Sequence, residues 1–165
     1  MYKIGDKIVY PMHGAGIIQG IEEKKVLKEK KSYYIMKMPV GDMMIMIPTN
    51  NHEEIGVRYI IDTKTAKNVI EKFDEETGTI NENWNKRYRE NMIKIRSGDI
   101  LEVLQVVKSL MIRDKERGLS TGERKMLSNA KQILFSELVL AKAAVVEEIE
   151  QMLDAAIEKQ MVKKL

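Results

Sequence analysis

The sequence contains no cysteine. This absence excludes disulfide bonds, thiolate metal sites and a cysteine nucleophile. Only two histidines are present, His13 and His52, and neither lies in a cluster with the spacing of metal ligands. We therefore expect a protein that has no metal or other cofactor, no small-molecule substrate and no enzymatic activity.

Long apolar runs are also missing. No stretch of about 18 apolar residues occurs, so the sequence predicts no membrane-spanning helix. The first residues, MYKIGDKIVYP, lack the apolar core of a signal peptide and are typical of folded structure. Because nothing in the composition requires an oxidising compartment, we expect a cytoplasmic protein.

The formal net charge of +3 is too small to indicate nucleic-acid binding by itself. The distribution of the charge is more informative. Residues 82–131 carry 12 basic and 7 acidic side chains, and no other part of the chain has a comparable excess. The only tryptophan, Trp84, lies at the start of this basic segment, among asparagines and arginines and not in an apolar run.

The spacing of apolar residues divides the chain into two parts. Up to residue 56, short runs rich in Ile, Val, Tyr and Met are separated by Gly, Pro and Asp, a pattern that predicts a small, curled, antiparallel β-barrel. Over residues 57–165 the spacing becomes helical and predicts a compact all-α domain of four to five helices. The predicted fold class is therefore α+β. The expected helices cover residues 63–73, 84–96, 100–113, a long stretch after Ser120, and 145–159.

The sequence NWNKRYREN, read as a helix, places Trp84, Arg87 and Tyr88 on one face, with Lys86 and Arg89 close by. Cations hold phosphates and a flat ring can stack on or wedge between bases, so this group is suited to nucleic acid. Alternatively, Trp84 packs on a neighbouring helix and the cations form a solvated face. A second basic group at a later corner between helices has acidic neighbours that can pair with it; its members are Arg113, Lys115, Arg117, Arg124 and Lys125.

Four stretches of the sequence together resemble the CarD/CdnL family of bacterial transcription regulators. They are GDKIVYPMHGAG (5–16), PTNNHEEIGVR (48–58), NWNKRYRENMIKIRSGD (83–99) and RDKERGLSTGERKMLSNAKQIL (113–134). The first stretch is also similar to the polymerase-binding module of transcription-repair coupling factors.

The resemblance implies a function for each part of the chain. Residues 1–56 are expected to form a Tudor-like domain that binds the β subunit of RNA polymerase. Residues 57–165 are expected to lie on promoter DNA at the upstream edge of the transcription bubble. There Trp84 is implied as a minor-groove wedge that slows reannealing and so stabilises the open complex, and polymerase would hold the protein on the nucleoid. The implied DNA-binding residues are Trp84, Lys86, Arg87, Arg89, Arg124 and Lys125.

The polymerase-binding surface is expected at Lys24, Lys25, Val26 and Met46. Family members often place arginine on the exposed strands of this domain, and the matching positions here are Lys24 and Met46. Lysine keeps the charge but loses the bidentate fork, and methionine has no charge. The run MMIMIP (43–48), with Val26 beside it, could instead offer a soft apolar patch. Strand alternation, however, predicts that half of these side chains fill the barrel.

Two other classes of function fit parts of the sequence. The first is a protein–protein adaptor whose helices do not contact DNA; a buried Trp84 with acidic neighbours would favour it. The second is a free-standing duplex-binding protein, which the small net charge argues against. An exposed Trp84 on a positive face would favour the polymerase-bound regulator.

Overall fold

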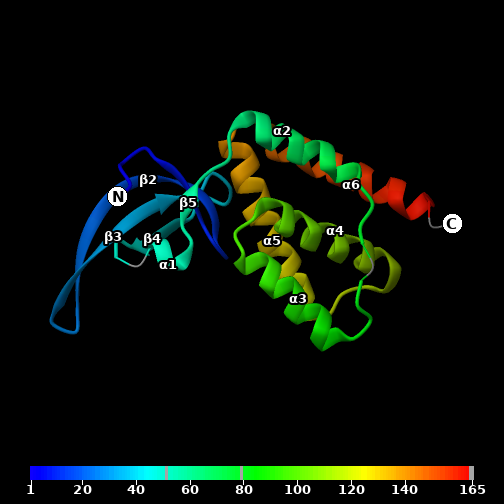
Figure 1. The fold of residues 1–165 in the computed structure, drawn as a ribbon, viewed down its shortest axis with the longest axis horizontal. Coiled ribbons are helices and arrows are strands. Elements are labelled where there is room, and N and C mark those ends of the chain that lie inside the picture. The colour runs from blue at the N-terminus through cyan, green and yellow to red at the C-terminus, as the bar shows by residue number, and fades with distance from the viewer. Residues whose placement is uncertain (51, 79, 164–165) are drawn as a thin grey trace.

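The computed structural model describes residues 1–50, 52–78 and 80–163, and it has a β-sheet at one end and a helical domain at the other (Figure 1). The α+β fold, with an N-terminal Tudor-like domain, is therefore confirmed. The strands are β1 (Lys7–Tyr10), β2 (Gly14–Val26), β3 (Glu29–Lys37), β4 (Met44–Pro48) and β5 (Arg58–Tyr59). The helices are α1 (His52–Ile55), α2 (Thr63–Glu71), the 3₁₀ helix η1 (Lys72–Asp74), α3 (Trp84–Arg96), α4 (Ile100–Arg117), α5 (Thr121–Leu140) and α6 (Val146–Lys163).

The five strands form one antiparallel sheet in the order β4-β3-β2-β1-β5. Its inner face buries a compact apolar cluster that includes Ile8, Ile18, Tyr34, Met36 and Ile47. Alternation along β4 sends Ile47 into this cluster, whereas Met44 is exposed and Met46 is half-buried on the outer face. In β4, therefore, the isoleucines fill the core and the methionines face outward.

The sheet continues past residue 56, the predicted domain boundary. Arg58 lies opposite Val9 and Tyr59 opposite Ile8, so β5 pairs with β1 as an edge strand. A strand of two residues is too short to show an alternating pattern, so β5 could not be predicted from the spacing of apolar residues. The step from sheet to helix falls between Tyr59 and Thr63, where α2 begins.

The helices α2, α3, α4 and α5 each begin at a polar capping residue. Asn83 Oδ1 accepts a hydrogen bond from the Lys86 amide at 3.1 Å, and Ser120 Oγ accepts one from the Glu123 amide at 3.2 Å. Such caps satisfy backbone donors that the first turn leaves free. The cap at Asn83 therefore fixes Trp84 in the first turn of α3. The helix α4 runs four residues beyond its predicted end, to Arg117, and the capping residue Gly118, with a φ of +78°, ends it.

A partly buried ion pair joins the sheet to the helices. The carboxylate of Glu137 on α5 has only 2% side-chain exposure, and it accepts hydrogen bonds from Arg58 Nη1 at 2.7 Å and Nη2 at 2.8 Å. The same carboxylate accepts one from the Ile61 amide at 3.0 Å, and Arg58 Nη2 also donates to the Gly98 carbonyl at 2.8 Å. One guanidinium thus links β5, the α3–α4 turn and α5.

The start of β2 lies directly on α5. A Cβ atom added to Gly14 would stand 2.8 Å from Ser136 Oγ and 3.3 Å from Ile133 Cα, and Gly14 has a φ of +115°. The Ala15 amide donates to Ser136 Oγ at 2.8 Å. The glycine of the HGAG turn is therefore required both by its backbone conformation and by this contact. Together with the ion pair, the contact holds the sheet and the helices in one fixed arrangement.

We predict that Glu137→Gln lowers the free energy of unfolding by about 2–4 kcal/mol, because Arg58, whose side chain is 33% exposed, then loses a charged partner that is buried. Chemical denaturation followed by circular dichroism measures this change. The matched control is Glu82→Gln, which removes an exposed pair with Arg117 and should cost less than about 1 kcal/mol. Equal effects of the two substitutions would contradict the role of Glu137 at the junction.

Candidate nucleic-acid interface

The first turn of α3 presents an indole that is both exposed and fixed. Trp84 is 43% exposed, and its ring stacks on Tyr88 with centroids 5.0 Å apart and an interplanar angle of 21°. Its Nε1 donates to Ser120 Oγ at 3.2 Å. Gly122 lies against both rings, since a Cβ added there would stand 3.7 Å from Tyr88 and 3.9 Å from Trp84. One side of the indole is therefore supported, and the other faces solvent.

A hydrogen-bonded network lies beneath this indole. Arg87 Nε donates to Glu123 Oε2 at 2.8 Å and its Nη2 donates to Oε1 at 3.2 Å. Arg87 Nη1 donates to the carbonyls of Asn81 and Glu82, both at 3.2 Å. Glu123 also sits within 3.4 Å of the Ser120 hydroxyl that receives the indole N–H. The network therefore ties the loop before α3, the first turn of α3 and the start of α5 together.

The expected DNA-facing position of Arg87 does not fit the structure. Arg87 is 3% exposed, because its guanidinium lies against the start of α5 and donates hydrogen bonds to the buried Glu123 carboxylate. The sequence carried a signal for this partner: Ser120 and Glu123 have the spacing of a capping box. The Glu123 carboxylate of this capping box, on α5, accepts hydrogen bonds from Arg87 on α3.

The charge state of Glu123 follows from its neighbours. Burial alone would raise the pKa of this carboxyl group, but the hydrogen bonds and charge of Arg87, with contributions from Arg113 and Ser120, outweigh burial and lower the pKa. Glu123 is therefore ionised at neutral pH. Its negative charge and the positive charge of Arg87 compensate each other where the starts of α3 and α5 meet, a region called the tip below.

The other predicted DNA-binding cations are at the surface. Lys86 and Arg89 on α3 and Arg124 and Lys125 on α5 are all exposed. Arg124 Nε also donates to the Leu119 carbonyl at 3.2 Å, which holds this side chain across the start of α5. Because the N-cap of α5 receives the indole N–H, the starts of both helices, with these cations, meet at Trp84. The structure thus brings the predicted groups together, except for Arg87.

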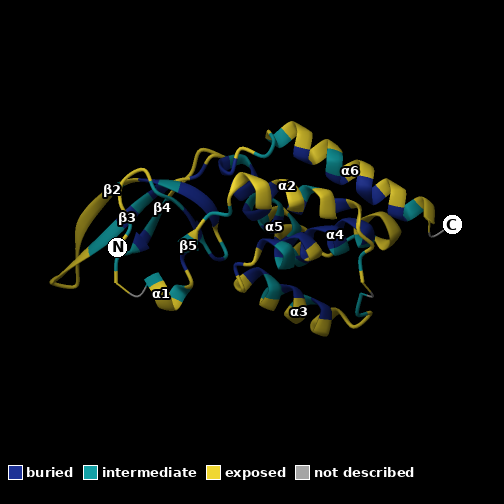
Figure 2. Cartoon of the chain, turned by 45° about the horizontal axis from the view of Figure 1, so that its top comes forward, coloured by how far each residue is buried: buried dark blue, intermediate teal, exposed yellow. Residues whose placement is uncertain are grey.

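The predicted polymerase-binding residues fall on two separate surfaces. Met46 lies opposite Ile35 on the outer face of the sheet. The β2–β3 hairpin projects beyond β4, and its projecting part is exposed (Figure 2). This part carries Lys24, Lys25 and Val26, and Val26 pairs with Glu29. Ile35 lies six positions after Glu29 along β3, which corresponds to a distance of about 20 Å. The prediction that Val26 lies beside the MMIMIP run is therefore wrong, because the hairpin is longer than β4.

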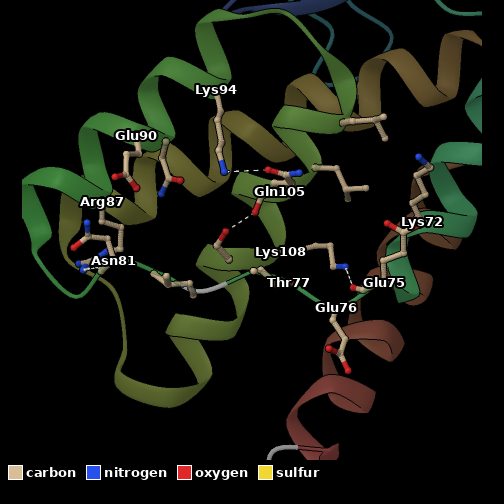
Figure 3. Close-up of a pocket in the computed structure, with 16 residues that line it drawn as sticks. Lys72, Glu75, Glu76, Thr77, Asn81, Arg87, Glu90, Lys94, Gln105 and Lys108 are labelled. Carbon is tan, nitrogen blue, oxygen red and sulfur yellow. Dashed lines mark hydrogen bonds between the residues drawn. The ribbon is translucent and has the colours of Figure 1, made fainter.

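A polar hollow of about 260 Å³ lies between α3, α4 and the loop after η1 (Figure 3). Lys108 is 4% exposed and donates to the Glu75 carbonyl, which also accepts from Gln160 Nε2 at 2.7 Å. Burial lowers the pKa of the Lys108 ammonium group, and the carboxylates of Glu75 and Asp74 partly oppose that shift. These contacts hold the loop against α4 and α6, so the polar groups here have a structural role.

The described residues contain no group of three or more histidine, aspartate or glutamate side chains that could hold a metal ion. Within the same ranges, no helix is long and apolar enough to cross a bilayer.

Two family models match the chain. Residues 2–61 match the CarD-like/TRCF RID domain, and residues 68–154 match the CarD C-terminal domain. A Bacillus subtilis (strain 168) protein named "Putative transcription factor YdeB" is 42% identical over 149 residues, which cover 90% of this chain and 97% of that protein. The likeness therefore extends over both the sheet and the helices.

We predict that Glu123→Gln lowers the free energy of unfolding by about 3 kcal/mol at neutral pH, since Arg87 is left buried without its charge partner. The pKa of Glu123 is below its ordinary value of 4.5 in the folded protein, so the stabilisation is present above that value and is lost as the pH falls through the folded-state pKa. The stability difference between wild type and Glu123→Gln should therefore be constant near neutral pH and narrow in acid.

Thermal unfolding of both proteins across a pH series measures this difference. The matched control is Glu148→Gln, on the exposed face of α6. A difference between wild type and Glu123→Gln that stays unchanged in acid would contradict the assignment of an ionised Glu123.

Proposed function

The chain belongs to the CarD/CdnL family of bacterial transcription regulators, and from that membership we propose that it binds the β subunit of RNA polymerase and stabilises the open promoter complex. In this proposal the sheet binds polymerase. The tip formed by α3 and α5 contacts promoter DNA at the upstream edge of the bubble, where Trp84 enters the minor groove. The protein acts in the cytoplasm, on the nucleoid, by binding alone and without catalysis.

The observation that carries the proposal is that Trp84 is exposed yet immobilised. A side chain already held by stacking and a hydrogen bond loses little conformational freedom on binding. Wedging into DNA costs a few kcal/mol of unstacking, and least where the duplex is already opening. Stacking of an aromatic ring on a base contributes roughly 1–3 kcal/mol. The balance favours a fork over intact duplex without any reading of base sequence.

The exposed cations support the same site. We assign phosphate contacts to Lys86, Arg89, Arg124 and Lys125, and we assign Arg87 to positioning the tip. About four phosphate contacts give weak and strongly salt-dependent binding to free DNA. A tether to polymerase raises the local concentration of the tip at the fork to about the millimolar range, which compensates for that weakness.

The outer face and free edge of β4 are the proposed contact with polymerase. β4 is the last strand of the sheet, so a partner strand can add to its open backbone edge. Met44 and Met46 face outward there and supply an adaptable apolar surface. Lys24 and Lys25 on the projecting hairpin supply positive charge at a second point, and Val26 supplies an apolar contact beside them.

The adaptor alternative, in which the helices bind only protein, has less support. A buried Trp84 with acidic neighbours would have favoured it. The indole is instead exposed, and the exposed side chains of Lys86 and Arg89 are on the same helix.

We predict that the protein lengthens the lifetime of open promoter complexes and that Trp84→Ala shortens the lengthened lifetime by about fivefold or more, the equivalent of losing a stacking contact of 1–3 kcal/mol. Competitor-challenge assays on the cognate polymerase measure the lifetime. Binding to polymerase should persist in Trp84→Ala, because the substitution lies far from the sheet. An unchanged lifetime with confirmed polymerase binding would refute the wedge.

We predict that Met46→Glu weakens binding to the polymerase β subunit by about tenfold or more, because an unpaired carboxylate would be buried in an apolar contact. Surface plasmon resonance with the isolated β subunit measures the change. The control is Val145→Glu, an equally drastic change at an exposed residue before α6 that is 53% exposed in the free protein. If both variants bind like wild type, the β4 face is not the contact.

A further inference from the structure

A shallow groove continues along α3 from the Trp84 tip. It has a volume of about 380 Å³, and all of its lining residues belong to α3: the apolar side chains of Trp84, Tyr88, Met92 and Ile93, and the polar side chains of Asn85, Arg89 and Arg96. The wedge proposal uses only the first turn of this surface. The remaining length of α3, toward its C-terminal end, has no assigned role.

Tyr88 and Met92 are partly buried against the core of the helical domain, but the exposure of Ile93 in this groove is not explained by the fold. Ile93 is 61% exposed, although isoleucine gains stability mainly by burial. Trp84, Tyr88 and Met92 stand four residues apart and so form one ridge along the helix. An aromatic pair followed by aliphatic side chains thus makes a continuous apolar strip on the surface. Such strips mark binding surfaces more often than isolated apolar residues do.

The charge along the groove has one sign. None of the described residues that line it carries a carboxylate, whereas glutamates line the polar hollow of Figure 3. Within the described residues, neither Arg89 nor Arg96 makes an ion pair. Two arginines whose charges are not neutralised, beside an apolar floor, fit a ligand that has both anionic groups and flat apolar faces.

We propose that this groove binds a short segment of single-stranded DNA, with a base on the free face of Trp84 and the backbone on Arg89 and Arg96. The inference rests on the proposed function and extends it from a wedge to a site that retains the displaced strand. A duplex presents phosphates outward and keeps the faces of its bases stacked inside, so it would leave Met92 and Ile93 without apolar contacts. A single strand can present base faces to the floor while its phosphates reach the arginines.

The length of the groove limits the size of the ligand. Trp84 and Arg96 are twelve residues apart on a helix, or about 18 Å. That length takes at most about five nucleotides at the 3.4 Å spacing of a stacked strand, and fewer if the strand is extended. The groove therefore matches the few bases freed next to a fork. A strand held there cannot re-pair, which slows closure of the bubble by more than the wedge alone.

The first test uses the fluorescence of Trp84, which is the only tryptophan in the chain. The full-length protein is titrated with a short oligothymidylate and with a hairpin duplex of similar length at low salt. We expect the single strand to quench the fluorescence and to bind about fivefold or more tightly than the duplex, as stacking of even one base would give. Equal or tighter binding of the duplex would overturn the proposal.

Substitutions identify the groove as the binding surface. Arg96→Gln should lower the slope of log affinity against log salt concentration by about 0.7, the value for one phosphate contact of a single strand. Ile93→Ser should weaken binding about threefold without changing that slope, because it removes an apolar contact and no charge. The matched control, Lys67→Gln, lies on α2 and should change neither quantity. Groove variants that behave like Lys67→Gln would contradict the proposal.

Open-complex lifetimes separate this inference from the function on which it rests. If Trp84→Ala shortens the lifetime while Arg96→Gln and Ile93→Ser do not, and the single strand fails to quench, then the groove proposal is wrong and the wedge stands. If no variant changes the lifetime but the single strand still binds, the proposed function fails and the groove binding stands. If the groove variants lose polymerase binding and keep strand binding unchanged, the occupant is protein and the proposal is overturned.

Discussion

The buried ion pair between Arg87 and Glu123 is the interaction on which the tip of the helical domain depends. It lies where α3 and α5 begin, and its guanidinium also donates to the two carbonyls of the loop before α3. A buried pair of this kind seldom adds much stability compared with an apolar contact, but it is satisfied in only one geometry. That geometry places the Ser120 hydroxyl where it accepts the hydrogen bond from the indole N–H of Trp84. The Arg87–Glu123 pair determines how α3 and α5 meet. The exposed ring of Trp84 therefore keeps a fixed orientation in solvent.

A second pair, between the buried Glu137 and the partly exposed Arg58, provides the same kind of constraint at the other end of α5. One helix therefore carries both the support of the tip, near its start, and the anchor of the sheet, near its end. This arrangement fits a protein whose sheet binds one large partner and whose tip must reach a fixed place on another. Tethered binding gains from a high local concentration only if the geometry allows both contacts at once. A flexible junction would reduce that gain.

Much of this arrangement could be predicted from the sequence, because local patterns carry it. The strands, the spacing of the apolar residues in the helices and the caps at Asn83 and Ser120 all follow from short-range rules, and the start of α3 at Trp84 follows from its cap. The features that could not be predicted depend on contacts between residues that are far apart in the sequence. Arg87 looked like a surface cation because Glu123 is 36 residues away. The strand β5 was too short to show a pattern. The position of Val26 depended on how far the β2–β3 hairpin extends beyond the end of β4. The run of methionines on the outer face of β4 was ambiguous until the register was known.

The central claim is that the tip formed by α3 and α5 lies at the upstream edge of the bubble in the open complex. The most direct test is site-specific photocrosslinking from a phenylalanine-based crosslinking residue in place of Asn85, an exposed neighbour of Trp84 that leaves the indole and its network intact. We expect crosslinks to promoter DNA at the upstream edge of the bubble, and only when polymerase and the open complex are both present. Crosslinks confined to protein, or to DNA far from that edge, would contradict it.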